Sequence, residues 1–156
     1  MRRVAVALAL AAAATACAGR APDAGAIQPW DLRERLRDVE VGQSAERARA
    51  RLGRDPVHRP GRPGEPYPSP LRTLELTDAS GRTVRVELYV VEAYAADGCA
   101  GAVHRSEPVA FANGAVIAVG WDAVEAGWRG WGGTLAALRD ARDASAGVGA
   151  CATREP

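Results

Sequence analysis

The sequence predicts an α+β fold in which two N-terminal helices pack on an antiparallel sheet of three or four strands. Apolar residues recur at helical spacing between positions 30 and 52, and they alternate with polar residues between positions 73 and 90. An Asn-Gly pair, a strong hairpin signal, joins two further apolar runs. The chain has 156 residues, enough for one domain of roughly 100–150 residues.

Two short helices are expected at the start of the domain. Leu32, Leu36 and Val39 are separated by four and three residues, the spacing that places side chains on one helix face. Ser44 is a suitable N-cap for a second helix, which ends at Gly53. The apolar face of this second helix is thin, because most of its apolar residues are alanine.

A proline-rich loop and two strands follow. Segment 54–70 contains six of the ten prolines, which excludes a helix or a central strand and predicts an extended loop. Strands are expected at 73–77 and 83–90, joined by a turn at 78–81 that has Asp first and Gly fourth. Strict alternation in the second strand predicts one buried face and one solvent-facing side.

A second hairpin is expected further along the chain. Residues 95–107 are polar and predict a loop. Strands at 109–112 and 116–121 are predicted on either side of the Asn113-Gly114 turn. The two N-terminal helices are the elements expected to cover the buried face of the sheet.

The N-terminus has the three-part pattern of an export signal. Two arginines precede an unbroken apolar run over 4–14, and small residues lead to Cys17. A buried alanine-rich helix is the alternative, but it does not explain this order. The small residues before Cys17 resemble the lipobox of bacterial lipoproteins, whose mature chain begins at a lipid-bearing cysteine.

That resemblance implies a protein held to a membrane by acyl chains on Cys17, at about 0.8 kcal/mol for each buried methylene. Because Ala18 stands where an Asp would resemble an inner-membrane retention signal, the outer membrane is expected, with the domain facing the periplasm. The predicted organisation is a signal peptide at 1–16, the lipidated cysteine and a flexible tether at 17–29, the α+β domain at 30–133, and a short helix with a loosely ordered tail at 134–156.

Cys99 and Cys151 remain once Cys17 is assigned to the lipid. A disulfide between them would close a loop of about 50 residues and stabilise the fold by about 4 kcal/mol in the chain-entropy model. Two unpaired thiols are the alternative. Neither cysteine belongs to a closely spaced pair, so no zinc or redox centre is predicted.

Three of the four tryptophans lie close together, at Trp121, Trp128 and Trp131, and Arg129 stands among them. They are flanked by glycines. One interpretation is that they cap the open edge of a core that has few other aromatic residues. Another is a partner-binding surface, since Trp and Arg are typical of interaction hot spots. A third places the rings at the membrane interface.

Several motifs resemble the SmpA/OmlA (BamE-like) family of small outer-membrane lipoproteins. Val41-Gly42-Gln43-Ser44, followed by Leu52-Gly53 and Pro56, is similar to the family's helix–turn–helix signature. The segments 108–114 and 119–121 are similar to its closing hairpin. The resemblance implies two helices on a sheet and a role in envelope or outer-membrane assembly. The same unit also resembles secreted β-lactamase-inhibitor proteins.

The composition excludes some classes of protein function. Arginines number 20 against 19 acids, so no large basic face for nucleic acid is implied. His58 and His104 are the only histidines, and a Ser106–His104–Asp97 arrangement on one loop does not constitute a catalytic site. We therefore expect no enzyme, no cofactor and no metal site, but a binding or scaffold module with an envelope protein as partner. The alternative is a periplasmic inhibitor or ligand-binding protein that uses the sheet face and the tryptophan segment.

Overall fold

The computed structural model describes residues 25–62, 64–95 and 102–146, and it confirms the predicted α+β fold. In chain order its elements are α1 (Pro29–Arg37), α2 (Ala45–Leu52), β1 (Arg72–Thr77), β2 (Thr83–Ala95), β3 (Ala102–Ala112), β4 (Ala115–Val119), α3 (Trp121–Trp128) and α4 (Leu135–Ala146). The strands form one antiparallel sheet in the order β1-β2-β3-β4, so neighbours in the chain are neighbours in the sheet.

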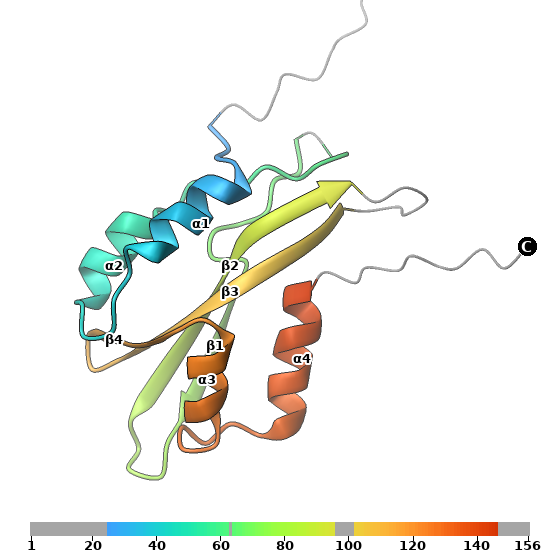
Figure 1. Cartoon of the computed structure of the whole chain (residues 1–156). Helices are drawn as coiled ribbons and strands as arrows, with labels where there is room; N and C mark the ends of the chain where they lie inside the picture. Colours follow the sequence, from blue (N-terminus) through green and yellow to red (C-terminus); the bar gives the residue numbers. More distant parts are fainter. Residues whose placement is uncertain (1–24, 63, 96–101, 147–156) are drawn as a thin grey trace, which may run out of the picture.

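Helices cover both faces of the sheet (Figure 1). On the N-terminal face, α1 and α2 share a hydrophobic cluster with Tyr89 and Phe111 of the sheet. On the C-terminal face, α3 and α4 share a second cluster with Val86 and Leu88. The expectation that only the two N-terminal helices cover the sheet is therefore wrong, because β2 and β3 bury side chains on both faces.

The two N-terminal helices form close to where the sequence predicts them. In α1, Leu32 and Leu36 are buried. Ser44 caps α2, since its hydroxyl oxygen accepts a hydrogen bond from the Arg47 backbone amide at 3.2 Å. α2 ends at Gly53, whose φ of 76° favours glycine.

The proline-rich segment has no helix or regular strand in its described residues, as predicted. It is held against the domain by Val57, which is fully buried. The backbone amides of Val57 and Tyr67 each donate to the other's carbonyl at 2.8 Å, and the His58 amide donates to the Ile27 carbonyl at 2.8 Å. These bonds place the loop beside the N-terminal face.

The turn between β1 and β2 forms at the predicted residues. The Gly81 amide donates to the Asp78 carbonyl at 2.9 Å, which closes the four-residue turn. Hydrogen bonds to the Asp78 carboxylate, first from the Ser80 hydroxyl and then from the Arg82 backbone amide, lower the pKa of Asp78 to about 2.

Strands β2 and β3 are longer than the sequence suggests. The polar loop expected at 95–107 is wrong over its second half, because β3 already begins at Ala102 and pairs with β2. The predicted solvent-facing side of β2 is exposed at Thr83 and Arg85, but the prediction is wrong at Glu87 and Tyr89, which are buried. A register shift between Val90 and Glu92 interrupts the alternation that the sequence pattern assumes.

The second hairpin turns at Asn113-Gly114, as predicted, and both residues have positive φ, 49° and 75°. The predicted strand at 116–121 ends earlier, at Val119, and Trp121 begins α3 instead. Thr134 caps α4, accepting a hydrogen bond from the Ala137 amide at 3.1 Å.

The predicted signal peptide and most of the tether lie outside the described residues, as does the end of the predicted tail. Within the three described segments, no helix has both the length and the apolar character that crossing a bilayer requires. The segment at 134–156, predicted as a short helix with a loosely ordered tail, begins with α4, which contacts β3 and buries Ala141.

Candidate functional site

The predicted lipid-attachment residue Cys17 and the predicted disulfide partners Cys99 and Cys151 lie outside the described residues. The predicted partner-binding residues all lie in or directly after α3. Trp128 is fully buried, and its indole N–H donates to the Thr134 carbonyl at 2.9 Å. Its side chain therefore contributes to the core and has no surface to offer a partner.

The other members of the tryptophan segment keep some exposure. Trp121 and Trp131 are half-buried and pack against the cluster on the C-terminal face, whereas Arg129 is exposed. The Trp121 indole N–H donates to the Ser106 carbonyl at 3.0 Å. Three indoles on one face support the interpretation that they complete a core with few other aromatic residues.

The glycines beside the tryptophans permit this close packing. A Cβ at Gly133 would overlap the Trp128 indole, and a Cβ at Gly127 would overlap the Trp131 ring. On the sheet beneath, β3 and β4 present Ala110, Ala112 and Ala118 to the same cluster. Small residues on both sides leave the volume that the Trp128 indole fills.

His104 contacts two segments of the fold that lie far apart in the sequence. Its Nε2 lies 3.1 Å from the Ala144 carbonyl oxygen of α4, and its ring lies 4.8 Å from the Tyr67 ring of the proline-rich segment. Burial lowers the pKa of His104, the nearby Arg59 charge lowers it further, and the hydrogen bond to Ala144 opposes both. The neutral imidazole thus links the loop on one side to the last turn of α4.

The third member of the Ser106–His104–Asp97 arrangement lies outside the described residues. His104 and Ser106 are both on β3, and Ser106 is fully buried. Among the residues that the structure does describe, no group of three or more His, Cys, Asp or Glu side chains is placed to hold a metal ion.

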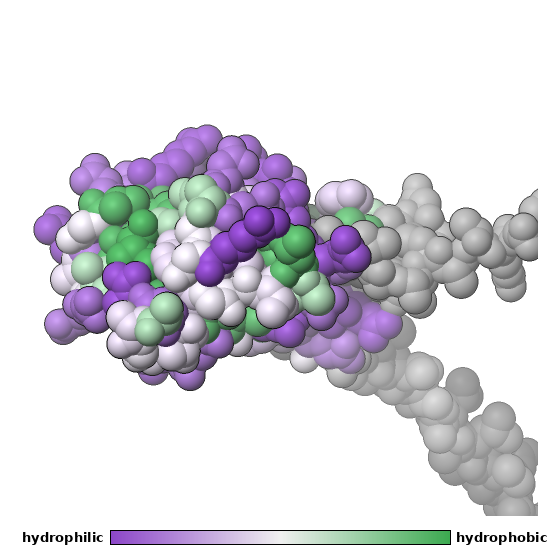
Figure 2. All heavy atoms as spheres, turned by 90° about the horizontal axis from the view of Figure 1, so that it is seen from below, coloured by the Kyte–Doolittle hydropathy of each residue, from purple (hydrophilic) through white to green (hydrophobic). Residues whose placement is uncertain are grey.

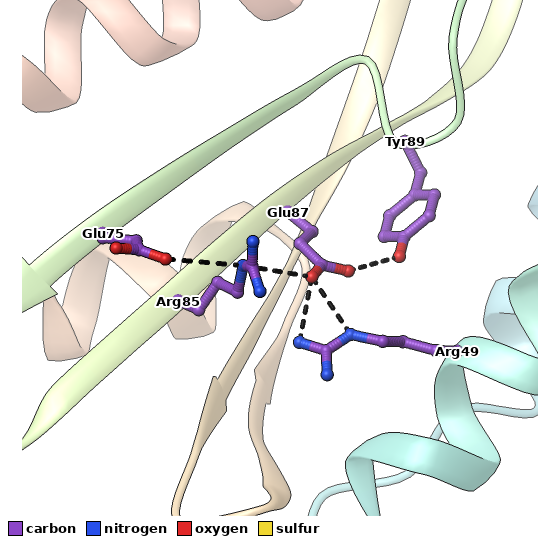
Figure 3. A network of polar contacts seen from close by, with 5 residues as sticks. All are labelled: Arg49, Glu75, Arg85, Glu87 and Tyr89. Atoms are coloured by element: carbon purple, nitrogen blue, oxygen red, sulfur yellow. Dashed lines mark hydrogen bonds and ion pairs between the residues drawn. The ribbon is translucent and has the colours of Figure 1, made fainter. Parts of the chain in front are cut away.

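A network of polar contacts lies on the N-terminal face, around Glu87 of β2 (Figure 3). The Glu87 side chain is only 6% exposed. Its Oε1 accepts from Arg49 Nε at 3.1 Å and lies 2.9 Å from Arg49 Nη2, while its Oε2 accepts from the Tyr89 hydroxyl at 2.6 Å. Arg85 Nε lies 3.6 Å from Glu87 Oε1 and 3.8 Å from Oε1 of Glu75.

The fold positions each member of this network. Arg49 extends from α2 toward the sheet, as Figure 3 shows, and its guanidinium lies 4.4 Å from the centre of the Phe111 ring. Glu87 and Tyr89 are two residues apart on β2 and therefore point to the same face. Burial and the adjacent Glu87 carboxylate raise the pKa of Tyr89, so its hydroxyl stays protonated and donates.

A cavity of about 270 Å³ opens beside this network, and we call it the arginine-lined cavity. Its walls come from the end of α2, the end of the proline-rich segment, β1 and β2: Arg49, Gly53, Arg54, Ser69, Pro70, Thr73, Arg85, Glu87 and Tyr89. The ionisable groups with charge near neutral pH are three arginines and one glutamate. The cavity is therefore positively charged, although the whole chain is nearly neutral.

No local sequence pattern marks this cavity, because its lining residues are spread from position 49 to position 89. Arg49 resembles the other arginines of α2, and Glu87 lies in what the alternation marks as the polar side of a strand. One feature of the sequence hints at the cavity. The second helix carries arginines next to a thin alanine face, and the small alanines leave space for long arginine side chains to reach the sheet.

The surface seen from below the view of Figure 1 is mostly hydrophilic or neutral, with small apolar areas separated by hydrophilic residues (Figure 2). The most exposed large apolar side chains, Trp30, Val41, Tyr94 and Leu135, come from different elements or connections. The face that Figure 2 shows therefore offers only small apolar areas to a partner.

No family model matches the chain, and neither the curated proteins nor the solved structures contain a significant match to it.

Proposed function

We propose that this chain is an exported lipoprotein of the outer membrane, anchored through Cys17, whose periplasm-facing domain is a non-catalytic binding or scaffold module in envelope assembly. Two features support the proposal. The N-terminal pattern resembles a lipobox. The domain carries a preformed, positively charged cavity beside a fully hydrogen-bonded Glu87, and this cavity is the observation that favours binding.

Membership of the SmpA/OmlA (BamE-like) family is part of the same proposal and rests on the short motifs around residues 41–56 and 108–121. The observed arrangement of two N-terminal helices against an antiparallel sheet agrees with what that resemblance implies. The structure differs from what the resemblance implies in one respect: α3 and α4 also cover the second face of the four-stranded sheet.

The anchor is tested by labelling with radioactive fatty acid in an exporting bacterial host. The wild-type chain should incorporate label and fractionate with outer membranes. Cys17→Ala should abolish labelling, whereas Cys99→Ala, which changes a cysteine outside the lipobox, should leave it intact. Wild-type protein that carries no label and remains in the cytosol would contradict the proposal.

The binding role is tested by placing a photo-crosslinking amino acid at position 54, beside the cavity, at 129, in the tryptophan segment, or at 47, as a control. Arg47, Arg54 and Arg129 are all exposed, so each substitution should be tolerated. A protein partner predicts one discrete adduct with an envelope protein from position 54 or 129 and none from 47.

The second candidate is a periplasmic ligand-binding protein, and the arginine-lined cavity favours it too. It predicts no protein adduct from positions 54, 129 and 47, together with a small anionic molecule that copurifies with the domain. The version of this candidate in which Trp121 and Trp128 line an aromatic concavity is not supported, because Trp128 is fully buried.

A further inference from the structure

We infer that the arginine-lined cavity binds a phosphate group, either inorganic phosphate or the phosphate monoester of a headgroup, through Arg49, Arg54 and Arg85. The inference deepens the proposed function, since it rests on the domain being a binding module and names the ligand chemistry.

The charge of the cavity is incompletely compensated within the protein. Glu87 Oε1 is shared by Arg49, at 2.9 Å, and by Arg85, at 3.6 Å. Among the described residues, the only other carboxylate paired with Arg85 is Glu75, at 3.8 Å, and Glu75 is well exposed and does not line the cavity. Among the residues that line the cavity, three guanidinium groups face one carboxylate, so the lining carries two excess positive charges. A phosphate monoester carries about −1.5 to −2 charges near neutral pH and matches this excess.

Arg54 provides free donors at the cavity wall. It follows Gly53, the residue with positive φ that ends α2, and the structure shows no hydrogen bond or ion pair for it among the described residues. A guanidinium presents five N–H donors in a planar fork that fits phosphate oxygens in pairs. An exposed and unpaired arginine beside two others costs electrostatic energy, which a bound anion would offset.

Ser69 gives an independent observation. It lines the cavity, and its Oγ is shielded from solvent without a hydrogen-bond partner among the described residues. A buried hydroxyl without a partner is uncommon in folded proteins and often marks a place where another molecule contributes the missing bond. Thr73, also at the wall, adds a second hydroxyl donor.

The size of the cavity leaves room for a phosphate group. Its volume of about 270 Å³ is just below the range of roughly 300–1,000 Å³ typical of small-molecule sites. A single carboxylate would leave one of the two excess charges uncompensated, so the site should prefer phosphate to acetate.

The test is isothermal titration calorimetry of the full-length, detergent-solubilised protein with inorganic phosphate at mildly alkaline pH and constant ionic strength. Wild-type protein should bind phosphate at one site and bind acetate at least about tenfold more weakly. Arg54→Gln should weaken phosphate binding about tenfold. Arg47→Gln removes the same charge from an exposed position of α2 that does not line the cavity, and it should leave the affinity unchanged.

Absence of saturable phosphate binding would overturn the inference. So would equal losses in Arg54→Gln and Arg47→Gln, which would show only a general effect of net charge, or equal affinity for acetate. Both variants change exposed side chains, and their folding is checked by circular dichroism.

Reconstitution distinguishes the two sources of phosphate. The protein is placed in phosphatidylcholine vesicles with or without phosphatidic acid, and its affinity for inorganic phosphate is measured in each. A fall in affinity with phosphatidic acid assigns the site to a lipid headgroup, and an unchanged affinity assigns it to soluble phosphate. Because titration does not require acyl chains and fatty-acid labelling does not require the cavity, failure of the lipid anchor and failure of the phosphate site are distinguishable.

Discussion

The two faces of the sheet are stabilised in different ways. The C-terminal face is apolar: Trp128 fills the space above small alanines, and its one polar atom donates to the Thr134 carbonyl. The N-terminal face combines an aliphatic cluster under α1 and α2 with a buried carboxylate, Glu87, and its cationic and phenolic partners. One face is therefore suited to stability, and the other keeps charge in place beside a cavity.

The difference indicates where function can reside. A closely packed apolar core around one buried indole tolerates little change in side-chain volume. A buried ionic cluster is costly to form and contributes less to stability than apolar packing of the same volume. Its retention on the N-terminal face is consistent with the binding role that we propose for the arginine-lined cavity.

The largest expected effect is on the C-terminal face. Trp128→Ala should lower the free energy of unfolding by about 3–5 kcal/mol, because it leaves a cavity that the surrounding alanines cannot fill. Trp30→Ala is the matched control, since Trp30 is 62% exposed, and it should change stability by no more than about 0.5 kcal/mol. Denaturant titration measures both. Equal effects would show that the two tryptophans are not in different environments.

The next effect is on the N-terminal face. Glu87→Gln keeps the shape but removes the charge, so it should cost about 2 kcal/mol, since hydrogen bonds to charged groups contribute about 1.5–3 kcal/mol. Glu75→Gln, at an exposed and more distant carboxylate, should cost at most about 0.5 kcal/mol. A Glu87→Gln variant that is as stable as wild type, or more stable, would contradict this expectation.

Removing one helix cap on each face of the sheet allows the stability of the two faces to be compared directly. Ser44→Ala removes the cap of α2, and Thr134→Ala removes the cap of α4. Each should lower the free energy of unfolding by about 1 kcal/mol. If α4 were only loosely attached, Thr134→Ala would leave global unfolding unchanged while increasing amide hydrogen exchange in α4 alone.

The smallest effect concerns His104, which contacts the proline-rich loop and α4. Because burial lowers its folded-state pKa below the ordinary value of about 6.5, the unfolded chain binds the proton more readily. The stability that depends on neutral His104 is fully present above pH of about 6.5 and is lost as pH falls through the folded-state pKa. His104→Gln should flatten this part of the stability profile relative to wild type, and His58→Gln should preserve it. Identical profiles for wild type and His104→Gln would exclude the linkage.

Local patterns predicted those elements whose residues decide their own conformation. Ser44 and Gly53 bound α2, Asp78 begins the first turn, and Asn113-Gly114 forms the second. Prediction was wrong where a residue's environment depends on distant segments. Glu87 lies between two apolar residues of β2, and the alternation therefore placed its side chain in solvent. In the structure α2 and Arg49 lie over it, and it is buried.

The tryptophan segment shows the same limit. Its composition allowed a core edge, a binding surface or rings at the membrane interface, and sequence alone had no means to choose among the three. The need for glycine at positions 127 and 133 is visible only in the structure. A side chain at 127 would overlap the Trp131 ring, and one at 133 would overlap the Trp128 ring.

Local sequence patterns were enough to predict the α+β class, the two N-terminal helices and the turns and to reveal the lipobox-like N-terminus, because each depends on residues within a few positions of one another. Three features became known only from the tertiary structure. Helices cover both faces of the sheet, Trp128 is buried, and three arginines from separate segments line one cavity. These features depend on contacts between distant parts of the chain, and the free energy of such contacts comes from burial and charge pairing that no local pattern records.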